Sequence, residues 1–88
     1  MWIAVGGPWR SWSIWMKRTS TQINGRTQWN AQVIVANPSS TDLDKAQVQS
    51  VLKYGEIYVT NQPTLRRVFE EARTAAKSAI DSFESSSH

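Results

Sequence analysis

The stretch that decides the fold is WSIWMKRTSTQINGRTQWNAQVIVA (residues 12–36), with Asn24-Gly25 at its centre. Asn-Gly suits the type I′ turn of a two-residue β-hairpin, because both central residues of that turn need a positive φ. With this turn, residues whose numbers sum to 49 face each other across two antiparallel strands. We therefore predict a hairpin with strands at residues 10–23 and 26–36.

The side chains of this stretch alternate between two faces, as they must in a strand. The predicted pairing places Ile14 opposite Val35 and Met16 opposite Val33 on one face, which we expect to be the core side. A slip of one residue would bury Lys17 and expose Met16, so the alternation supports the register. The opposite, solvent-facing side is expected to hold Trp15, Lys17, Thr19, Thr21, Gln28, Asn30, Gln32 and Ile34.

Two helices and a short strand are predicted after the hairpin. The segment Thr41-Asp42-Leu43-Asp44 is typical of a helix start, because carboxylates cap and stabilise the first turn. Gly55 suits the end of that helix, and residues 56–60 are rich in β-branched and aromatic residues, as strands are. The apolar stripe of the first helix is expected to comprise Leu43, Ala46, Val48, Val51 and Leu52.

The second helix is predicted to follow Asn61-Gln62-Pro63, since proline is favoured in the first helical turn. Its apolar residues recur at steps of three and four, from Leu65 to Phe83, which is the period of an amphipathic helix. Charged residues on its outer side are spaced for ion pairs of i, i+4 type: Arg66 with Glu70, Arg67 with Glu71, and Lys77 with Asp81.

These elements predict an α+β fold with the order β-β-α-β-α, in which residues 2–5 are a candidate extra leading strand. The expected architecture is a small antiparallel sheet built on the N-terminal hairpin, with both helices packed on one face. The 88 residues fit one domain, which we place at residues 1–84, followed by a flexible tail at 85–88.

Composition argues against several functional classes. The chain has no cysteine, and its one histidine, His88, is the last residue, so neither a zinc site nor a Cys–His or Ser–His nucleophile is expected. Asp42 and Asp44 are better explained by helix capping than by metal binding. We expect no catalytic activity and no cofactor. With no recognisable leader or membrane span, we also expect a cytoplasmic protein.

The charge distribution indicates a binding surface. Residues 1–41 include four basic residues and no acidic one, and the five tryptophans all lie there, although the net charge of the whole chain is only +3. Aromatic rings interleaved with cations suit nucleic acid, because bases stack on the rings and phosphates meet the charges. The predicted nucleic-acid or partner-binding residues are Arg10, Trp15, Lys17, Arg26, Gln28, Asn30, Gln32 and Ile34.

Two alternatives stay open at this point. The same Trp15–Ile34 patch, or a free sheet edge, would suit a protein partner in an adaptor, an inhibitor or a homodimer. Alternatively, the N-terminal strand or the last helix covers Trp15, which makes it a core residue without a ligand.

Overall fold

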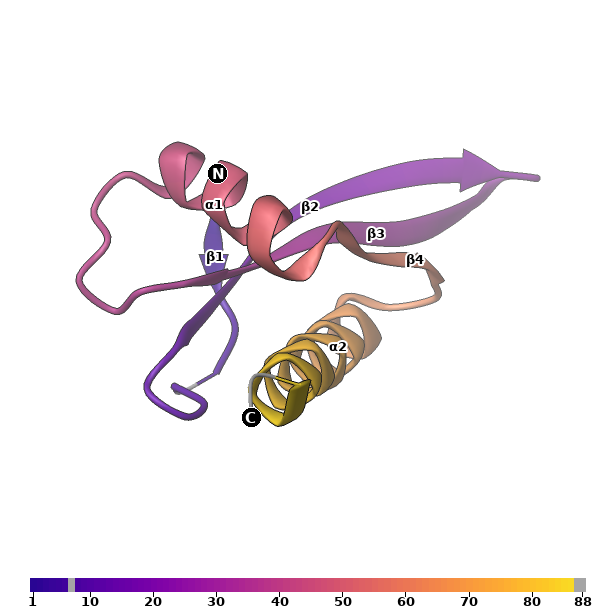
Figure 1. Cartoon of the computed structure of the whole chain (residues 1–88). Coiled ribbons are helices and arrows are strands. Elements are labelled where there is room, and N and C mark those ends of the chain that lie inside the picture. The colour runs from indigo at the N-terminus through magenta and orange to yellow at the C-terminus, as the bar shows by residue number, and fades with distance from the viewer. Residues whose placement is uncertain (7, 87–88) are drawn as a thin grey trace.

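The computed structural model describes residues 1–6 and 8–86 (Figure 1). Its four strands form one antiparallel sheet in the order β1-β2-β3-β4. The α+β class is thereby confirmed, and so is the extra leading strand. The elements are β1 (Ile3–Ala4), β2 (Ser13–Ile23), β3 (Arg26–Ala36), α1 (Leu43–Tyr54), β4 (Ile57–Gln62) and α2 (Leu65–Ser86).

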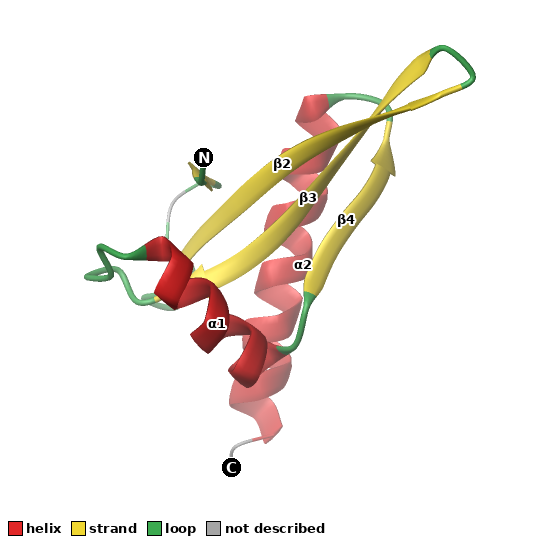
Figure 2. Cartoon of the chain, turned by 90° about the horizontal axis from the view of Figure 1, so that it is seen from above, coloured by secondary structure: helices red, strands yellow, loops and turns green. Residues whose placement is uncertain are grey.

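The hairpin of β2 and β3 has the predicted register throughout, from Ser13 opposite Ala36 to Ile23 opposite Arg26. Asn24 and Gly25 have φ values of 52° and 76°, as a type I′ turn requires. The tip of this hairpin projects beyond both β4 and the first turn of α2 (Figure 2). The ribbon is therefore two-stranded at its far end.

Strand β2 begins three residues later than predicted, because a second tight turn precedes it. Trp9 and Trp12 face each other through two backbone hydrogen bonds of 2.9 Å. The two residues between them, Arg10 and Ser11, have φ values of 49° and 69°. Neither is glycine, so nothing in their local sequence indicates a left-handed turn.

Helix α2 covers the face of the sheet that was predicted to be the core side. The buried residues there are Val5, Ile14, Met16, Ala31, Val33, Val35 and Val59 from the sheet side, with Val68, Ala72, Ala76 and Ile80 from α2. Trp12, Trp29 and Phe69 are partly buried against this cluster. The core-face prediction for the hairpin is confirmed.

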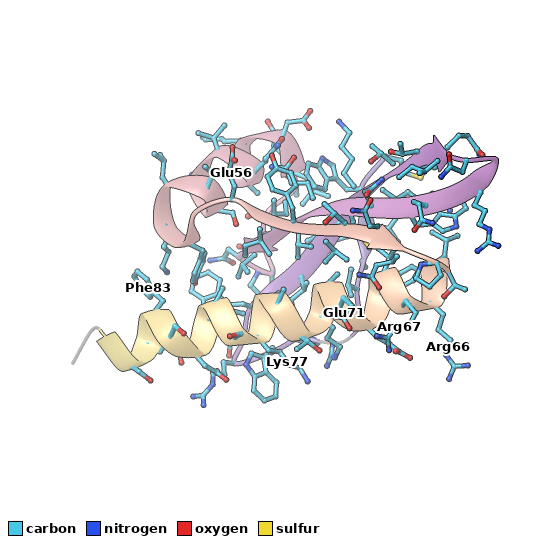
Figure 3. The ribbon with its side chains drawn as sticks, turned by 90° about the vertical axis from the view of Figure 1, so that its right-hand side faces the viewer. Glu56, Arg66, Arg67, Glu71, Lys77 and Phe83 are labelled. Carbon is cyan, nitrogen blue, oxygen red and sulfur yellow. The ribbon has the colours of Figure 1, made fainter. Side chains whose placement is uncertain are left out.

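The position of α1 differs from the expected packing of both helices on one face. Its N-terminal half lies on the opposite face from α2, where Leu43 and Ala46 pack with Ile34 and Ala36 (Figure 3). Only its end reaches the α2 side, where the Tyr54 ring lies 5.3 Å from the Phe83 ring. The physical reason is that Ile34 and Ala36 are themselves apolar and need a cover.

The inward stripe of α1 consists of residues spaced by three and four: Leu43, Ala46, Ser50 and Tyr54. The predicted stripe was therefore wrong for Val48 and Leu52, which are 60% and 81% exposed. Ala46 and Ser50 are small, so the helix approaches the sheet closely at these positions. Because Val48 and Leu52 are large and apolar, the sequence pattern indicated their side of the helix and not the side that is buried.

Helix α2 starts at Leu65, where the Thr64 hydroxyl accepts a 3.2 Å hydrogen bond from the Arg67 amide. Two of the predicted ion pairs form, Arg66–Glu70 at 3.4 Å and Arg67–Glu71 at 3.3 Å (Figure 3). The helix also includes residues 85 and 86, so the predicted flexible tail at 85–88 is wrong for these two residues. Residues 87 and 88 of that tail lie outside the described residues.

Candidate binding face of the sheet

The sheet face on the α1 side is covered at one end only. Helix α1 sits over Ile34 and Ala36, and the rest of that face, toward the hairpin tip, has no helix above it (Figure 1). We call this uncovered part the outer face. It consists of Lys17, Thr19, Thr21, Ile23, Arg26, Gln28, Asn30, Gln32, Tyr58 and Thr60.

The predicted exposed patch of Trp15 and Ile34 does not exist. Ile34 is completely buried, and Trp15 is partly buried in the same cluster as Leu43 and Trp2. Strand β1 also runs alongside, with Ala4 opposite Trp15. The prediction that these two side chains form a binding surface was wrong, because the N-terminal strand and α1 both cover this end of the face.

Arg10 lies away from the outer face. Its guanidinium forms ion pairs with Asp81 at 2.8 Å and with Glu84 at 3.3 Å near the end of α2. Asp81 also accepts a 3.1 Å hydrogen bond from the Trp9 indole, and the Lys77 ammonium lies 4.4 Å from the centre of that ring. The basic character of the N-terminal segment is therefore partly neutralised by acidic residues of α2.

Lys17 and Tyr58 flank a shallow hollow on the outer face. The hollow has a volume of about 160 Å³, and Asn30 and Gln32 lie on β3 between the two walls. Tyr58 is 55% exposed, whereas Lys17 extends its ammonium to 5.7 Å from the centre of the Trp2 ring. The side chains of Lys17 and Tyr58 thus line one depression, and the Lys17 ammonium lies near the Trp2 ring.

Sequence analysis missed Tyr58 as a site residue, although the pattern contained it. Ile57 and Val59 pack into the core on the α2 side, so alternation along β4 directs Tyr58 and Thr60 to the outer face. What the pattern lacked was the position of β4 in the sheet. Its pairing with β3 places Tyr58 directly opposite Gln32.

The amide side chains of the outer face are held in place by hydrogen bonds. Gln32 accepts from the Gln47 side chain at 2.8 Å, which ties the face to α1. Asn30 donates to the Thr21 hydroxyl at 3.1 Å and accepts from the Asn61 amide at 3.0 Å. A primary amide has two donors and two acceptor lone pairs, so each group keeps capacity for a ligand.

Arg26 and Gln28 extend the outer face along the projecting ribbon. Arg26 is exposed next to the turn, opposite Ile23, and Gln28 lies opposite Thr21. Six residues of β2 separate Lys17 from this end. At about 3.4 Å per residue, the backbone positions of Lys17 and Arg26 are about 20 Å apart along the ribbon. Strands β2 and β3 contain no acidic residue, so no carboxylate of the ribbon competes for an anion.

Other kinds of site find little support among the described residues. They hold no group of three or more His, Cys, Asp or Glu side chains placed to bind a metal ion. Asp42 caps α1 by accepting from the Lys45 amide at 3.2 Å, and Asp44 accepts from the Trp2 indole at 3.2 Å. In the part of the chain that the structure covers, the helices are too short or too polar to cross a membrane.

Comparison of the chain with protein-family models, with curated proteins and with solved structures gives no match.

Proposed function

We propose that this protein is a non-enzymatic module that binds single-stranded nucleic acid on the outer face. The observation that supports this best is that the exposed Tyr58 ring and the Lys17 side chain line one hollow. A base can stack on the ring while a neighbouring phosphate meets the cation, which is the common arrangement in single-strand binding.

The rest of the outer face suits the same ligand. Asn30 and Gln32 offer donors and acceptors between the two walls of the hollow, at the level of a stacked base. The 20 Å from Lys17 to Arg26 corresponds to about six stacked nucleotides at 3.4 Å each. This length falls within the range of sites known for single-strand binding modules, about 4–16 nucleotides.

The geometry favours a single strand over a duplex. In a duplex the bases are stacked on each other, so an exposed ring such as Tyr58 has nothing to stack on. A protein partner at Trp15 and Ile34, the alternative from sequence, loses its basis because Ile34 is buried.

Binding is tested by fluorescence anisotropy with a labelled oligonucleotide of about 12 nucleotides at several salt concentrations. With two phosphate contacts, log K should fall against log salt with a slope of about −1.4. Tyr58→Ala should weaken binding by about 1–3 kcal/mol, while Tyr58→Phe keeps the ring and the affinity. Lys17→Ala should reduce the slope by about 0.7, and Lys45→Ala, at an exposed lysine of α1, should not.

Two results would contradict the proposal. One is the absence of salt-dependent binding up to near-millimolar protein. The other is equal affinity of wild type and Tyr58→Ala. Tighter binding of a duplex of the same length would instead point to insertion of the projecting ribbon into a groove.

A further inference from the structure

Three aromatic rings converge on the ammonium of Lys53 where the ends of α1 and α2 meet. The ammonium nitrogen lies 4.3 Å from the centre of the Trp12 ring, 4.7 Å from that of Phe83 and 5.2 Å from that of Tyr54. Phe83 lies on the side of α2 that faces α1 (Figure 3). A cation is attracted to an aromatic ring within about 6 Å of its centre, so all three rings act on the same charge. We call Trp12, Tyr54 and Phe83 the aromatic cage.

The rings, and not an acidic residue, hold the charge of Lys53. The side chain belongs to an exposed residue, and it forms no ion pair with a carboxylate among residues 1–6 and 8–86. A primary ammonium such as that of lysine is strongly hydrated. A group that has methyls in place of its N–H protons gives up less hydration on entering a cage of rings, which is how proteins recognise quaternary ammonium ligands.

Two hollows share Lys53 as part of their walls. One has a volume of about 230 Å³ and is bordered by Trp12 and Tyr54, and the other, of about 390 Å³, is bordered by Tyr54 and Phe83. Among the described residues, Lys53 is the one charged side chain that lines either hollow. The Tyr54 hydroxyl is buried and finds no hydrogen-bond partner in the described part of the chain. Packing of the core alone does not explain such an orphaned group.

We propose that the aromatic cage binds the trimethylammonium group of a small zwitterion, and that Lys53 swings out to pair with the anionic group of that ligand. In the free protein Lys53 fills the cage, because its tether gives it a high effective concentration there. Once displaced, it stays beside the site as a positive charge. A ligand with an anion next to its trimethylammonium group, such as phosphocholine, suits this charge, whereas a simple cation meets a like charge.

The aromatic cage is separate from the outer face. Trp12 directly precedes β2, and the hairpin tip follows the other end of that strand. The proposal therefore does not depend on nucleic-acid binding.

Titration of the whole chain with phosphocholine and with tetramethylammonium, followed by NMR of the Trp12 indole N–H, tests the proposal. Wild type should bind phosphocholine about fivefold or more tighter than tetramethylammonium. Lys53→Ala should bind tetramethylammonium about fivefold tighter than wild type does, because the competing ammonium is gone. The same variant should lose the preference for phosphocholine, because the ion pair is gone too. Lys77→Ala is the matched control: its ammonium lies 4.4 Å from the one ring of Trp9, and its loss should leave both affinities unchanged.

Exchanging Phe83 tests the cage itself. Phe83→Leu keeps an apolar side chain at a position that is 37% exposed and removes one ring, so it should weaken phosphocholine binding about three- to tenfold. Phe83→Tyr keeps the ring and should keep the affinity. Three results would overturn the proposal: no shift of the Trp12 signal with either compound up to about 100 mM, equal affinities of wild type and Phe83→Leu, or an unchanged preference for phosphocholine in Lys53→Ala.

Vesicles of phosphatidylcholine distinguish the two sources of this chemistry, since they present the same group on a membrane surface. Cosedimentation of wild type, but not of Phe83→Leu, with the vesicles would identify a lipid headgroup as the ligand. Binding of free phosphocholine without cosedimentation would identify a soluble compound.

Discussion

Replacing Ser50 by alanine tests how α1 is attached to the sheet. The Ser50 hydroxyl is buried, with the residue 2% exposed, and it accepts a 3.0 Å hydrogen bond from the Val35 amide. That amide points toward the β4 side of β3, but β4 pairs with β3 only as far as Val33. Ser50 therefore satisfies a backbone donor at the place where the sheet ladder has ended.

The size of the effect follows from two opposing contributions. A buried amide left without an acceptor costs about 1–3 kcal/mol. Alanine is the better helix former, which returns about 0.5 kcal/mol. Ser50→Ala should therefore lower the free energy of unfolding by about 0.5–2.5 kcal/mol. In a domain of this size, 1 kcal/mol corresponds to a shift in Tm of about 4–8 °C.

Urea denaturation followed by tryptophan fluorescence and circular dichroism measures this change. Ser78→Ala, in an exposed position of α2, is the control, since it has the same gain in helix propensity and leaves no buried donor unsatisfied. The difference between the two variants should be about 1–3 kcal/mol, which is the cost of the orphaned amide. Equal stability of the two variants would refute the role assigned to Ser50.

Two further predictions concern local backbone structure. Ser11→Gly should raise the free energy of unfolding by about 0.5–1 kcal/mol, because a φ of 69° is costly for serine and free for glycine; a loss of stability in urea denaturation would contradict this. Asp42→Ala should cost about 0.5–2 kcal/mol by removing the cap of α1, and Asp42→Asn should retain most of the stability. Equal thermal melts of these two Asp42 variants would show that the cap contributes nothing.

The hairpin could be predicted from sequence because its determinants are local. Asn24-Gly25 sets the turn, and the alternation from Ile14 to Val35 fixes which side chains face the core. Helix α2 could also be predicted from sequence, since the period of its apolar residues matches its buried face. In the hairpin and in α2, the residues that the local sequence pattern places on the apolar side are the ones that the fold buries.

The candidate site was only partly predictable. Lys17, Arg26, Gln28, Asn30 and Gln32 lie on the expected face because strand alternation places them there. Tyr58 joins them only through the pairing of β4 with β3, which is a contact between distant segments. Arg10 lies away from this face for a comparable reason: its ion-pair partners on α2 are more than 70 residues away along the chain, so local sequence does not indicate them.

The sequence by itself determined the β2–β3 hairpin and its register, the α2 stripe and the row of polar residues on the ribbon. The tertiary structure decided which side of α1 turns inward and therefore which apolar residues remain outside. Strand and turn geometry depend on neighbours in the chain, and so they are encoded in short patterns. The face that α1 buries depends instead on the shape available above Ile34 and Ala36, where small side chains such as Ala46 and Ser50 pack closer than Val48 or Leu52 would.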